Sequence, residues 1–325
     1  MTETISMPQA ELKEKLGGDP DAALWSFVQA KEPNPAGVRL ALAAGADANA
    51  ANGYGWTVLM EAAMRDDANV VCDLLSMGQL EINARDRSGR TALMAAAEYG
   101  QRGTALVLLM SGAQVNVQDH SGSTAAMAAA KHGHGLILAA LKEKGADLVT
   151  PSDRNGETTL MKAARPGDED TINVVLSAAQ ESFFGPSHLP HADLHDAVNA
   201  RDHHGETALM KAARNGRIDA ARLLLMHGAK RNAVNHQGKT ALSLARQNRQ
   251  TETADLLESY SRLVRDQGTA IVQTPHGAVL AVEVGRDDLM QIFGQAGPAL
   301  TAPGGAGGGP VTPTAKQSPV SKYSL

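Results

Sequence analysis

The sequence predicts an all-α fold in which helix-turn-helix units stack side by side into a solenoid with turns at its tips. Self-similarity is the first reason, because one short motif recurs about every 33 residues along most of the 325-residue chain. Composition is the second, because hydrophobic residues make up 43% of the chain and aromatic residues only 3%. A core of Ala, Leu, Val and Met suits closely packed small helices.

The recurring motif is visible by eye. Its copies are GYGWTVLMEAAMRD, RSGRTALMAAAEYG, HSGSTAAMAAAKHG, RNGETTLMKAARPG, HHGETALMKAARNG and HQGKTALSLARQNR, which begin at residues 53, 87, 120, 154, 203 and 236. The glycines that mark the turn in each copy are Gly55, Gly89, Gly122, Gly156, Gly205 and Gly238, with spacings of 34, 33, 34, 49 and 33. One unit is therefore longer than the others.

Each unit divides into a turn, a helix, a second helix and a loop. An Asp or Asn before the Gly is typical of tight turns, since Gly adopts positive φ without steric cost. The Thr two positions after the Gly predicts a helix cap, and the apolar run that follows predicts the first helix. In GRIDAARLLLMHG, leucines at helical spacing predict the second helix, which ends at Gly228.

Period, turn and helices together resemble the ankyrin repeat. The ending GADxN of the ankyrin unit also has counterparts here, at Gly45 to Asn49, Gly112 to Asn116 and Gly228 to Asn232. The resemblance implies a one-dimensional solenoid that binds partners through its turn tips and first helices. The sequence departs from the family pattern where a His is usual. Methionines occupy that place in five copies, at Met60, Met94, Met127, Met161 and Met210, and we expect them to be core residues.

The repeats divide the chain into consecutive segments. We expect an N-terminal segment (1–18), an ankyrin-repeat domain (19–298) and a disordered Gly/Pro-rich tail (299–325). Within the domain we expect a degenerate N-terminal cap (19–51), six repeats (52–268) and a degenerate C-terminal cap (269–298). A small hairpin around Pro275 to Gly277 is an open alternative for the start of the C-terminal cap.

Composition also limits the classes of function and the location. A net charge of −5 and a pI near 6.1 argue against general nucleic-acid binding. A single cysteine, Cys72, fits a reducing compartment, and neither a secretory signal nor an apolar membrane span is visible. These features predict a cytoplasmic protein without membrane association, and export by a non-Sec route is the alternative.

The motif copies contain no nucleophile paired with a base, no phosphate-binding glycine loop and no close pair of acids. We therefore expect a non-catalytic scaffold or regulator without cofactors, whose partner is another protein. Two alternatives stay open. One is a translocated bacterial effector that captures a host protein and uses its C-terminus as an address, and the other is a metal-linked role of the long unit.

Candidate partner-binding residues lie on the first helices and the turn tips. Lys162, Arg165, Lys211 and Arg214 flank the Ala pairs of two units and predict a patch for an acidic partner, unless they are simply solvated helix faces. Tyr54 and Trp56 place aromatic side chains at a tip where other units are polar. Such residues are typical of binding hot spots, although they could instead pack on the N-terminal cap.

The long unit carries a 16-residue insertion, residues 180–195, after which Asn199 takes the place of the closing Asn. Pro190 is a possible start for a short helix with His191 and His195 one turn apart, which with His188 makes a weak zinc candidate because thiolate ligands are absent. Phe183 and Phe184 are the more informative pair. They predict either a lid on the second helices or an anchor for a partner.

Overall fold

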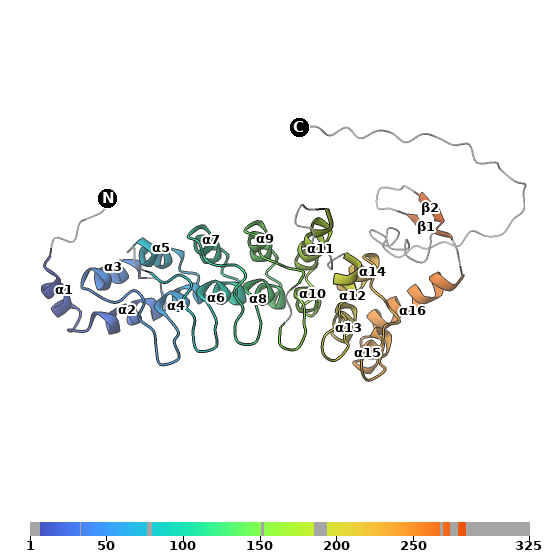
Figure 1. Cartoon of the computed structure of the whole chain (residues 1–325), viewed down its shortest axis with the longest axis horizontal. Helices are drawn as coiled ribbons and strands as arrows, with labels where there is room; N and C mark the ends of the chain where they lie inside the picture. Colours follow the sequence, from blue (N-terminus) through green and yellow to red (C-terminus); the bar gives the residue numbers. More distant parts are fainter. Residues whose placement is uncertain are drawn as a thin grey trace, which may run out of the picture.

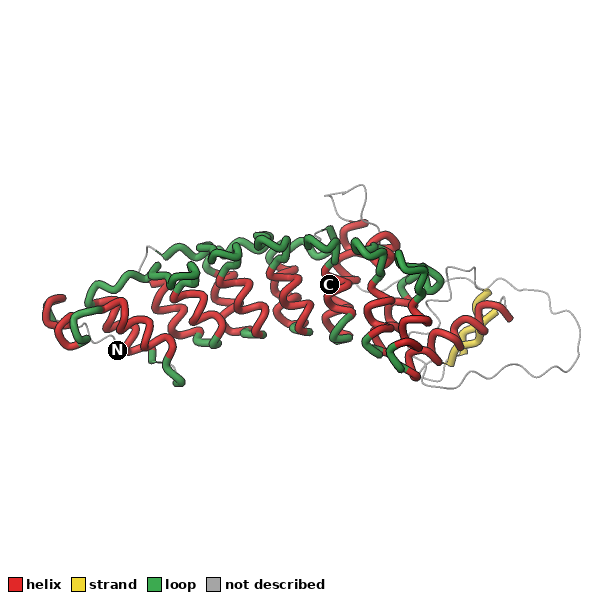
Figure 2. The backbone as a smooth tube through the Cα atoms, turned by 90° about the horizontal axis from the view of Figure 1, so that it is seen from below, coloured by secondary structure: helices red, strands yellow, loops and turns green. Residues whose placement is uncertain are grey.

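The structure is a computed structural model that describes residues 7–32, 34–76, 80–150, 153–184, 194–266, 269–273 and 279–283. The helices of these residues form an elongated array in two rows, with loops projecting from one long edge (Figures 1 and 2). The predicted all-α solenoid of ankyrin type is confirmed. The predicted tail, residues 299–325, lies outside the described residues.

Two rows of helices build the array, and each helix packs on the one before and the one after it in its own row. The inner row consists of α2 (Pro20–Gln29), α4 (Val58–Met64), α6 (Ala92–Tyr99), α8 (Ala125–His132), α10 (Thr159–Ala164), α13 (Ala208–Arg214) and α15 (Ala241–Gln247). The outer row consists of α3 (Pro35–Ala43), α5 (Ala68–Ser76), α7 (Arg102–Met110), α9 (Gly135–Glu143), α11 (Glu169–Phe184), α14 (Ile218–Met226) and α16 (Thr251–Asp266).

The inner helices begin as the motif predicts. The hydroxyl of each motif Thr accepts a hydrogen bond from the backbone N–H three residues later, for example Thr91 from Met94 at 3.3 Å. This satisfies one of the backbone donors that a helix start leaves free. All five motif methionines are buried in the core, as predicted, together with the Ala pairs that follow them.

The closing asparagines tie each unit to the next one along the array. The side-chain oxygens of Asn49, Asn83, Asn116 and Asn199 accept backbone N–H groups of Glu81, Gln114, Asp147 and Lys230 at 2.8, 2.8, 2.9 and 2.7 Å. Asn199 therefore does what the other three do, although an insertion precedes it. The array continues in register across the insertion.

The insertion begins as an extension of an outer helix. α11 runs for 16 residues, whereas α5, α7, α9 and α14 each run for 9. The chain returns through the short helix α12 (Leu194–Asn199), which packs on α11 and overlaps the predicted helix from Pro190. Residues 185–193 lie outside the described residues.

The two ends of the array differ. At the N-terminal end, α2 and α3 form the helix pair expected for residues 19–51, and α1 (Gln9–Lys15) packs on α3. At the other end, β1 (Thr269–Gln273) pairs antiparallel with β2 (Val279–Glu283), which is the hairpin alternative for the start of the predicted cap. Residues 284–298 of that cap are not described. No helix in the described parts of the chain is both long and apolar enough to cross a membrane.

Candidate partner-binding surface

The turn between consecutive repeats projects as a finger beyond the inner helices, and its shape is fixed from within. In the fourth finger, the Asp153 carboxylate accepts the backbone N–H groups of Asn155 at 2.8 Å and Glu157 at 3.0 Å. Gly156 adopts a φ of +74° at the bend, which only glycine takes up without strain. The same carboxylate or amide bonds form at Asn52, Asp86, Asp119, Asp202 and Asn235.

Neighbouring fingers are joined to one another near their tips. The residue after the finger Asp or Asn donates its backbone N–H to a carbonyl of the preceding finger. These bonds run from Arg87 to Tyr54, His120 to Ser88, Arg154 to Ser121, His203 to Asn155 and His236 to His204, at 2.9, 2.8, 2.7, 2.8 and 3.0 Å. The fingers therefore form one continuous ladder, and their side chains stand at a fixed spacing.

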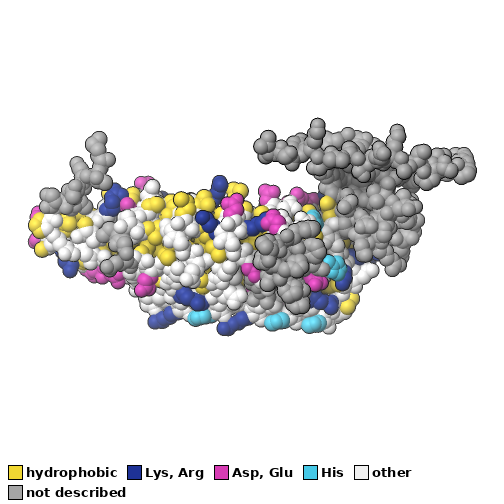
Figure 3. Space-filling view, turned by 45° about the horizontal axis from the view of Figure 1, so that its top comes forward, with side chains coloured by type: hydrophobic (Ala, Val, Ile, Leu, Met, Phe, Trp, Pro, Cys, Tyr) yellow, Lys and Arg dark blue, Asp and Glu magenta, His cyan; other side chains and the backbone are white. Residues whose placement is uncertain are grey.

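The donors of this ladder share a chemical character. Arg87, His120, Arg154, His203 and His236 all have exposed side chains, and we call these five residues the fingertip ridge. Figure 3 shows Arg or Lys and His side chains following one another along the lower edge of the array. They are the first letters of the five aligned motif copies from residue 87 onward, so the signal for them was present in the sequence.

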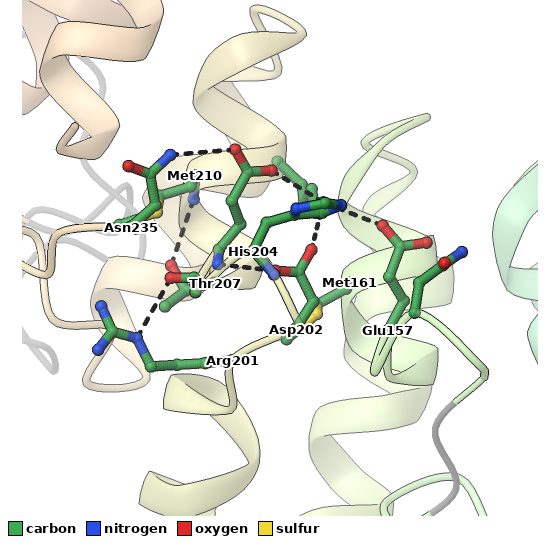
Figure 4. A network of polar contacts seen from close by, with 12 residues as sticks. Glu157, Met161, Arg201, Asp202, His204, Thr207, Met210 and Asn235 are labelled. Carbon is green, nitrogen blue, oxygen red and sulfur yellow. Dashed lines mark hydrogen bonds and ion pairs between the residues drawn. The ribbon is translucent and has the colours of Figure 1, made fainter. Parts of the chain in front are cut away.

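The predicted basic residues of the inner helices lie in a different setting. Lys162 and Lys211 are buried, with 8% and 4% of their surface exposed. The Lys211 ammonium contacts Asp202 at 2.6 Å and Glu206 at 2.9 Å in its own repeat, and Glu157 of the preceding repeat at 3.0 Å. Lys162 pairs with Asp153 and, at 2.7 Å, with Glu157. Figure 4 shows Glu157, Asp202 and Asn235, which come from three successive repeats, in one continuous network of polar contacts.

The two predicted arginines close the same network at its rim. Arg165 pairs with Glu157 and Arg214 with Glu206, and about two fifths of each arginine side chain is exposed, 40% and 39%. The Asn235 amide also donates to Glu206 at 3.3 Å. Four carboxylates, at Asp153, Glu157, Asp202 and Glu206, thus face four cations, at Lys162, Arg165, Lys211 and Arg214. We call these eight residues the charged network.

Protonation within the charged network follows from these contacts. Burial by itself raises the pKa of Glu157, but hydrogen bonds from Lys162 and Lys211 outweigh it and lower the pKa below its ordinary value. The pKa of Glu206 is lowered in the same way by Lys211. Burial favours a lower pKa for Lys211, but its hydrogen bonds with Asp202, Glu206 and Glu157 raise it. Glu157, Glu206 and Lys211 therefore stay ionised near neutral pH.

Lys162 and Lys211 consequently lie in the interior instead of on an open face, and their charge is matched within the chain. The cause is the Glu at the end of each of these two fingers, Glu157 or Glu206. Its carboxylate turns toward the inner helix that follows and binds the lysine of that helix. Arg165 and Arg214 keep a half-exposed edge, so contact of these two with a partner stays a prediction. Lys162, Arg165, Lys211 and Arg214 therefore do not form a patch of four free cations.

Comparison with known proteins addresses the family directly. A family model described as ankyrin repeats (3 copies) matches residues 27–119, 108–183 and 188–265, which is more than half of the chain. The chain belongs to the ankyrin repeat family. The comparison with curated proteins gives no match. Many solved structures have similar chains.

One of these chains comes from the structure of the Bd0816 predatory endopeptidase from Bdellovibrio bacteriovorus in complex with immunity protein Bd3460. It is 26% identical in sequence, and the match covers 65% of our chain and 99% of that chain with a TM-score of 0.52. The ankyrin repeats described above therefore have a relative of similar fold in a complex between two proteins.

The two aromatic candidates at the first finger of the ankyrin array have separate roles. Tyr54 is 74% exposed and its side chain is available to a partner. Trp56 packs against the core, donates its indole N–H to Glu61 at 3.1 Å, and carries the guanidinium of Arg90 4.9 Å above its ring. Trp56 thus stabilises the finger, and Tyr54 keeps the profile expected of a contact residue.

The candidates in the insertion stay predictions. Phe183 and Phe184 end α11, but their side chains lie outside what the structure describes, as do His188 and His191. His195 is on α12 and lies 3.7 Å from the carboxylate of its neighbour Asp196. Among the described residues, no group of three or more His, Cys, Asp or Glu side chains is placed to hold a metal ion.

Proposed function

We propose that this ankyrin array is a non-catalytic scaffold that binds another protein through its finger tips and the adjoining face of its inner helices. Family membership supports protein binding in general, and the relative of similar fold occurs in a protein complex. The construction of the fingers supports the choice of surface.

The observation that carries this proposal is the finger ladder. The backbone of each finger is held by its own Asp or Asn and by the next finger, while the side chains at the tips remain exposed. A surface that is ordered before binding loses little conformational entropy when a partner docks, which favours affinity. Side chains at the tips also point into solvent without packing in the core, and Tyr54 is the clearest case.

Site-specific photo-crosslinking in the source cells tests the choice of surface. A benzophenone amino acid replaces Tyr54 or Asn155 at the tips, and Met110 or Leu136 on the outer helices in matched controls. All four positions are exposed, so each replacement leaves the core intact. We expect one defined cross-linked product from the tip positions, identified by mass spectrometry, and none from the outer ones. Products from α7 and α9 alone would contradict the proposal.

A second candidate function is the inhibition of an enzyme by direct binding. The likeness to a chain from an endopeptidase and immunity protein complex favours it. If the cross-linked partner is an enzyme, its activity is measured with increasing amounts of the purified chain. Inhibition that is complete at one chain per enzyme is expected of an inhibitor, whereas unchanged activity assigns the array to scaffolding.

The remaining expectations have tests of their own. A reporter fused with and without residues 299–325 distinguishes a cytoplasmic protein from an exported effector. Metal analysis of the purified chain decides the role of His188, His191 and His195, since a structural zinc ion would be present in stoichiometric amount. Replacing Phe183 and Phe184 by Ser separates a lid, which lowers the melting temperature, from an anchor, which lowers partner binding.

A further inference from the structure

The fingertip ridge is one-sided in charge. Its five members, Arg87, His120, Arg154, His203 and His236, are two permanent cations and three histidines, whose imidazole rings donate N–H groups. Each is followed by a Ser, an Asn, a His or a Gln, and the acids in the adjoining sequence are the finger Asp residues that precede four of the five. Arg87 and Arg154 have no ion-pair partner in the part of the chain that the structure describes.

The acids nearest to the ridge are already engaged. Asp153 and Asp202 bind Lys162 and Lys211 in the charged network, and Asp86 lies 3.7 Å from Arg90. Asp119 has no ion-pair partner among the described residues, but its carboxylate accepts the hydroxyl of Ser121 and two backbone N–H groups. Within the described fingers, two unmatched arginines, Arg87 and Arg154, thus stand against one unmatched carboxylate at the tips, so the formal charge there is positive although the chain as a whole carries −5.

The ridge is also ordered. The imidazole rings of His120, His203 and His236 lie against the glycine of the preceding finger, so close that a Cβ atom on Gly89, Gly156 or Gly205 would stand 2.9, 2.8 or 2.7 Å from the ring carbon Cδ2. Together with the backbone ladder, this contact sets the direction in which the rings leave the surface. Donors held in place lose less entropy on binding than free ones.

We propose that the fingertip ridge binds an acidic segment of the protein partner, laid along the tips with its carboxylates facing the arginines and histidines. This rests on the proposed function and adds the chemistry of the partner. A polypeptide fits better than a nucleic acid, because only two of the five members are permanently charged and the rest of the chain is acidic. Phosphate binding depends on many permanent cations.

Fluorescence anisotropy with a short labelled poly-glutamate peptide tests the ridge on the full chain. The key variant is Arg87→Ser/Arg154→Ser. Its matched control is Arg102→Ser/Lys144→Ser, which removes the same charge from exposed positions at the start of α7 and just after α9. We expect the first variant to weaken binding about three- to tenfold and the second to leave it unchanged. Binding to wild type should also weaken with added salt.

Three results would overturn the proposal. The first is no binding of poly-glutamate to the wild type, and the second is equal weakening by both double variants, which indicates attraction without a site. The third is tighter binding of a single-stranded oligonucleotide of equal charge, which assigns the ridge to nucleic acid. Melting curves show whether each variant is folded. Because neither ridge arginine has an ion-pair partner among the described residues, we expect unchanged melting temperatures.

The same variants separate this inference from the proposed function. Photo-crosslinking from Tyr54 is repeated in cells that carry Arg87→Ser/Arg154→Ser. We expect the cross-linked product to diminish strongly. If it persists at the wild-type level, the array binds its partner without the ridge charges, so the inference fails and the proposed function stands. If the wild type gives no product at any tip position, the proposed function fails instead.

Discussion

Two junctions of this array solve one packing problem in different ways. Where α6 meets α8, the inner-helix positions after the motif Met are Ala95 and Ala128, and small residues allow close approach. Where α10 meets α13, the same positions hold Lys162 and Lys211, whose charges are matched by finger carboxylates. We call them the alanine junction and the charged junction. A repeat fold thus tolerates very different chemistry at equivalent positions.

The charged junction lies beside the 16-residue insertion of the outer row. The insertion begins within α11 and ends within α12, and α11 also packs on α14 of the following repeat. On the inner side of the same junction, Lys211 bonds to Glu157 of the preceding repeat. We infer from this difference that buried ion pairs between two repeats, here called the clamp, hold the inner helices together beside the insertion of the outer row.

Removing the central cation should have the largest effect. Lys211→Met leaves Glu157, Asp202 and Glu206 buried without their shared partner, and breaking a buried ion pair on one side costs about 3 to 5 kcal/mol. Urea denaturation followed by circular dichroism measures the free energy of unfolding. Lys144→Met, at an exposed position, is the matched control and should change it by less than about 0.5 kcal/mol.

The loss should be partly reversible if charge imbalance is its cause. Adding Asp202→Asn to Lys211→Met removes the carboxylate whose ion-pair partner is Lys211, so three carboxylates again face three cations and stability should rise relative to the single variant. A double variant that is no more stable than Lys211→Met would show that the packing of the lysine stem, and not its charge, holds the charged junction.

The sequence predicted the stacked helices well and the charged network poorly, because only the first is encoded by local patterns. Period, Thr caps and the match of Asn199 to Asn116 are local patterns, and the structure contains each of them. The partner of Lys162 in its own repeat, Glu157, lies before the helix cap in the finger, so the helical spacing of ion pairs does not reveal it. The bond from Lys211 to Glu157 joins two repeats and has no local signal at all.

The next largest effect on stability is expected when the buried ion pairs of the charged junction are rebuilt in the alanine junction. Ala95 is fully buried in the alanine junction, and Ala95→Lys places a cation there beside Arg90, so we expect strong destabilisation. Arg90 occupies the place that Glu157 has in the charged junction, and Asp86 that of Asp153. Adding Arg90→Glu should therefore recover about 1 to 3 kcal/mol of the free energy of unfolding. Recovery of none would show that the alanine junction lacks room for the clamp.

Acid should distinguish the junctions as well. The pKa values of Asp153, Glu157, Asp202 and Glu206 are lowered in the folded chain, with burial opposing and the lysine hydrogen bonds dominating. A lowered pKa means stability that is present above the ordinary value, 4.5 for Glu and 3.8 for Asp, and is lost as the pH falls through the folded value. We therefore expect the free energy of unfolding to fall as the pH drops below about 4.5.

The variant Glu157→Gln/Glu206→Gln identifies the source of this acid sensitivity. It should be less stable than the wild type at pH 7 and should lose less stability on acidification, because two of the four titrating groups are gone. Denaturation curves at a series of pH values measure the difference. Parallel pH profiles for the two proteins would place the acid sensitivity outside the charged network.

The fingers should give the smallest effects, and equal ones at both junctions. Gly89 and Gly156 have φ of +81° and +74°, and a Cβ atom on either would also meet the His ring of the next finger. Gly238 has a φ of +70° with nothing within 4 Å of a Cβ position. Gly238→Ala therefore isolates the backbone strain, about 1 kcal/mol, whereas Gly89→Ala and Gly156→Ala should each cost about 2 kcal/mol. Unequal costs at Gly89 and Gly156 would show that the fingers, and not only the inner helices, differ between the junctions.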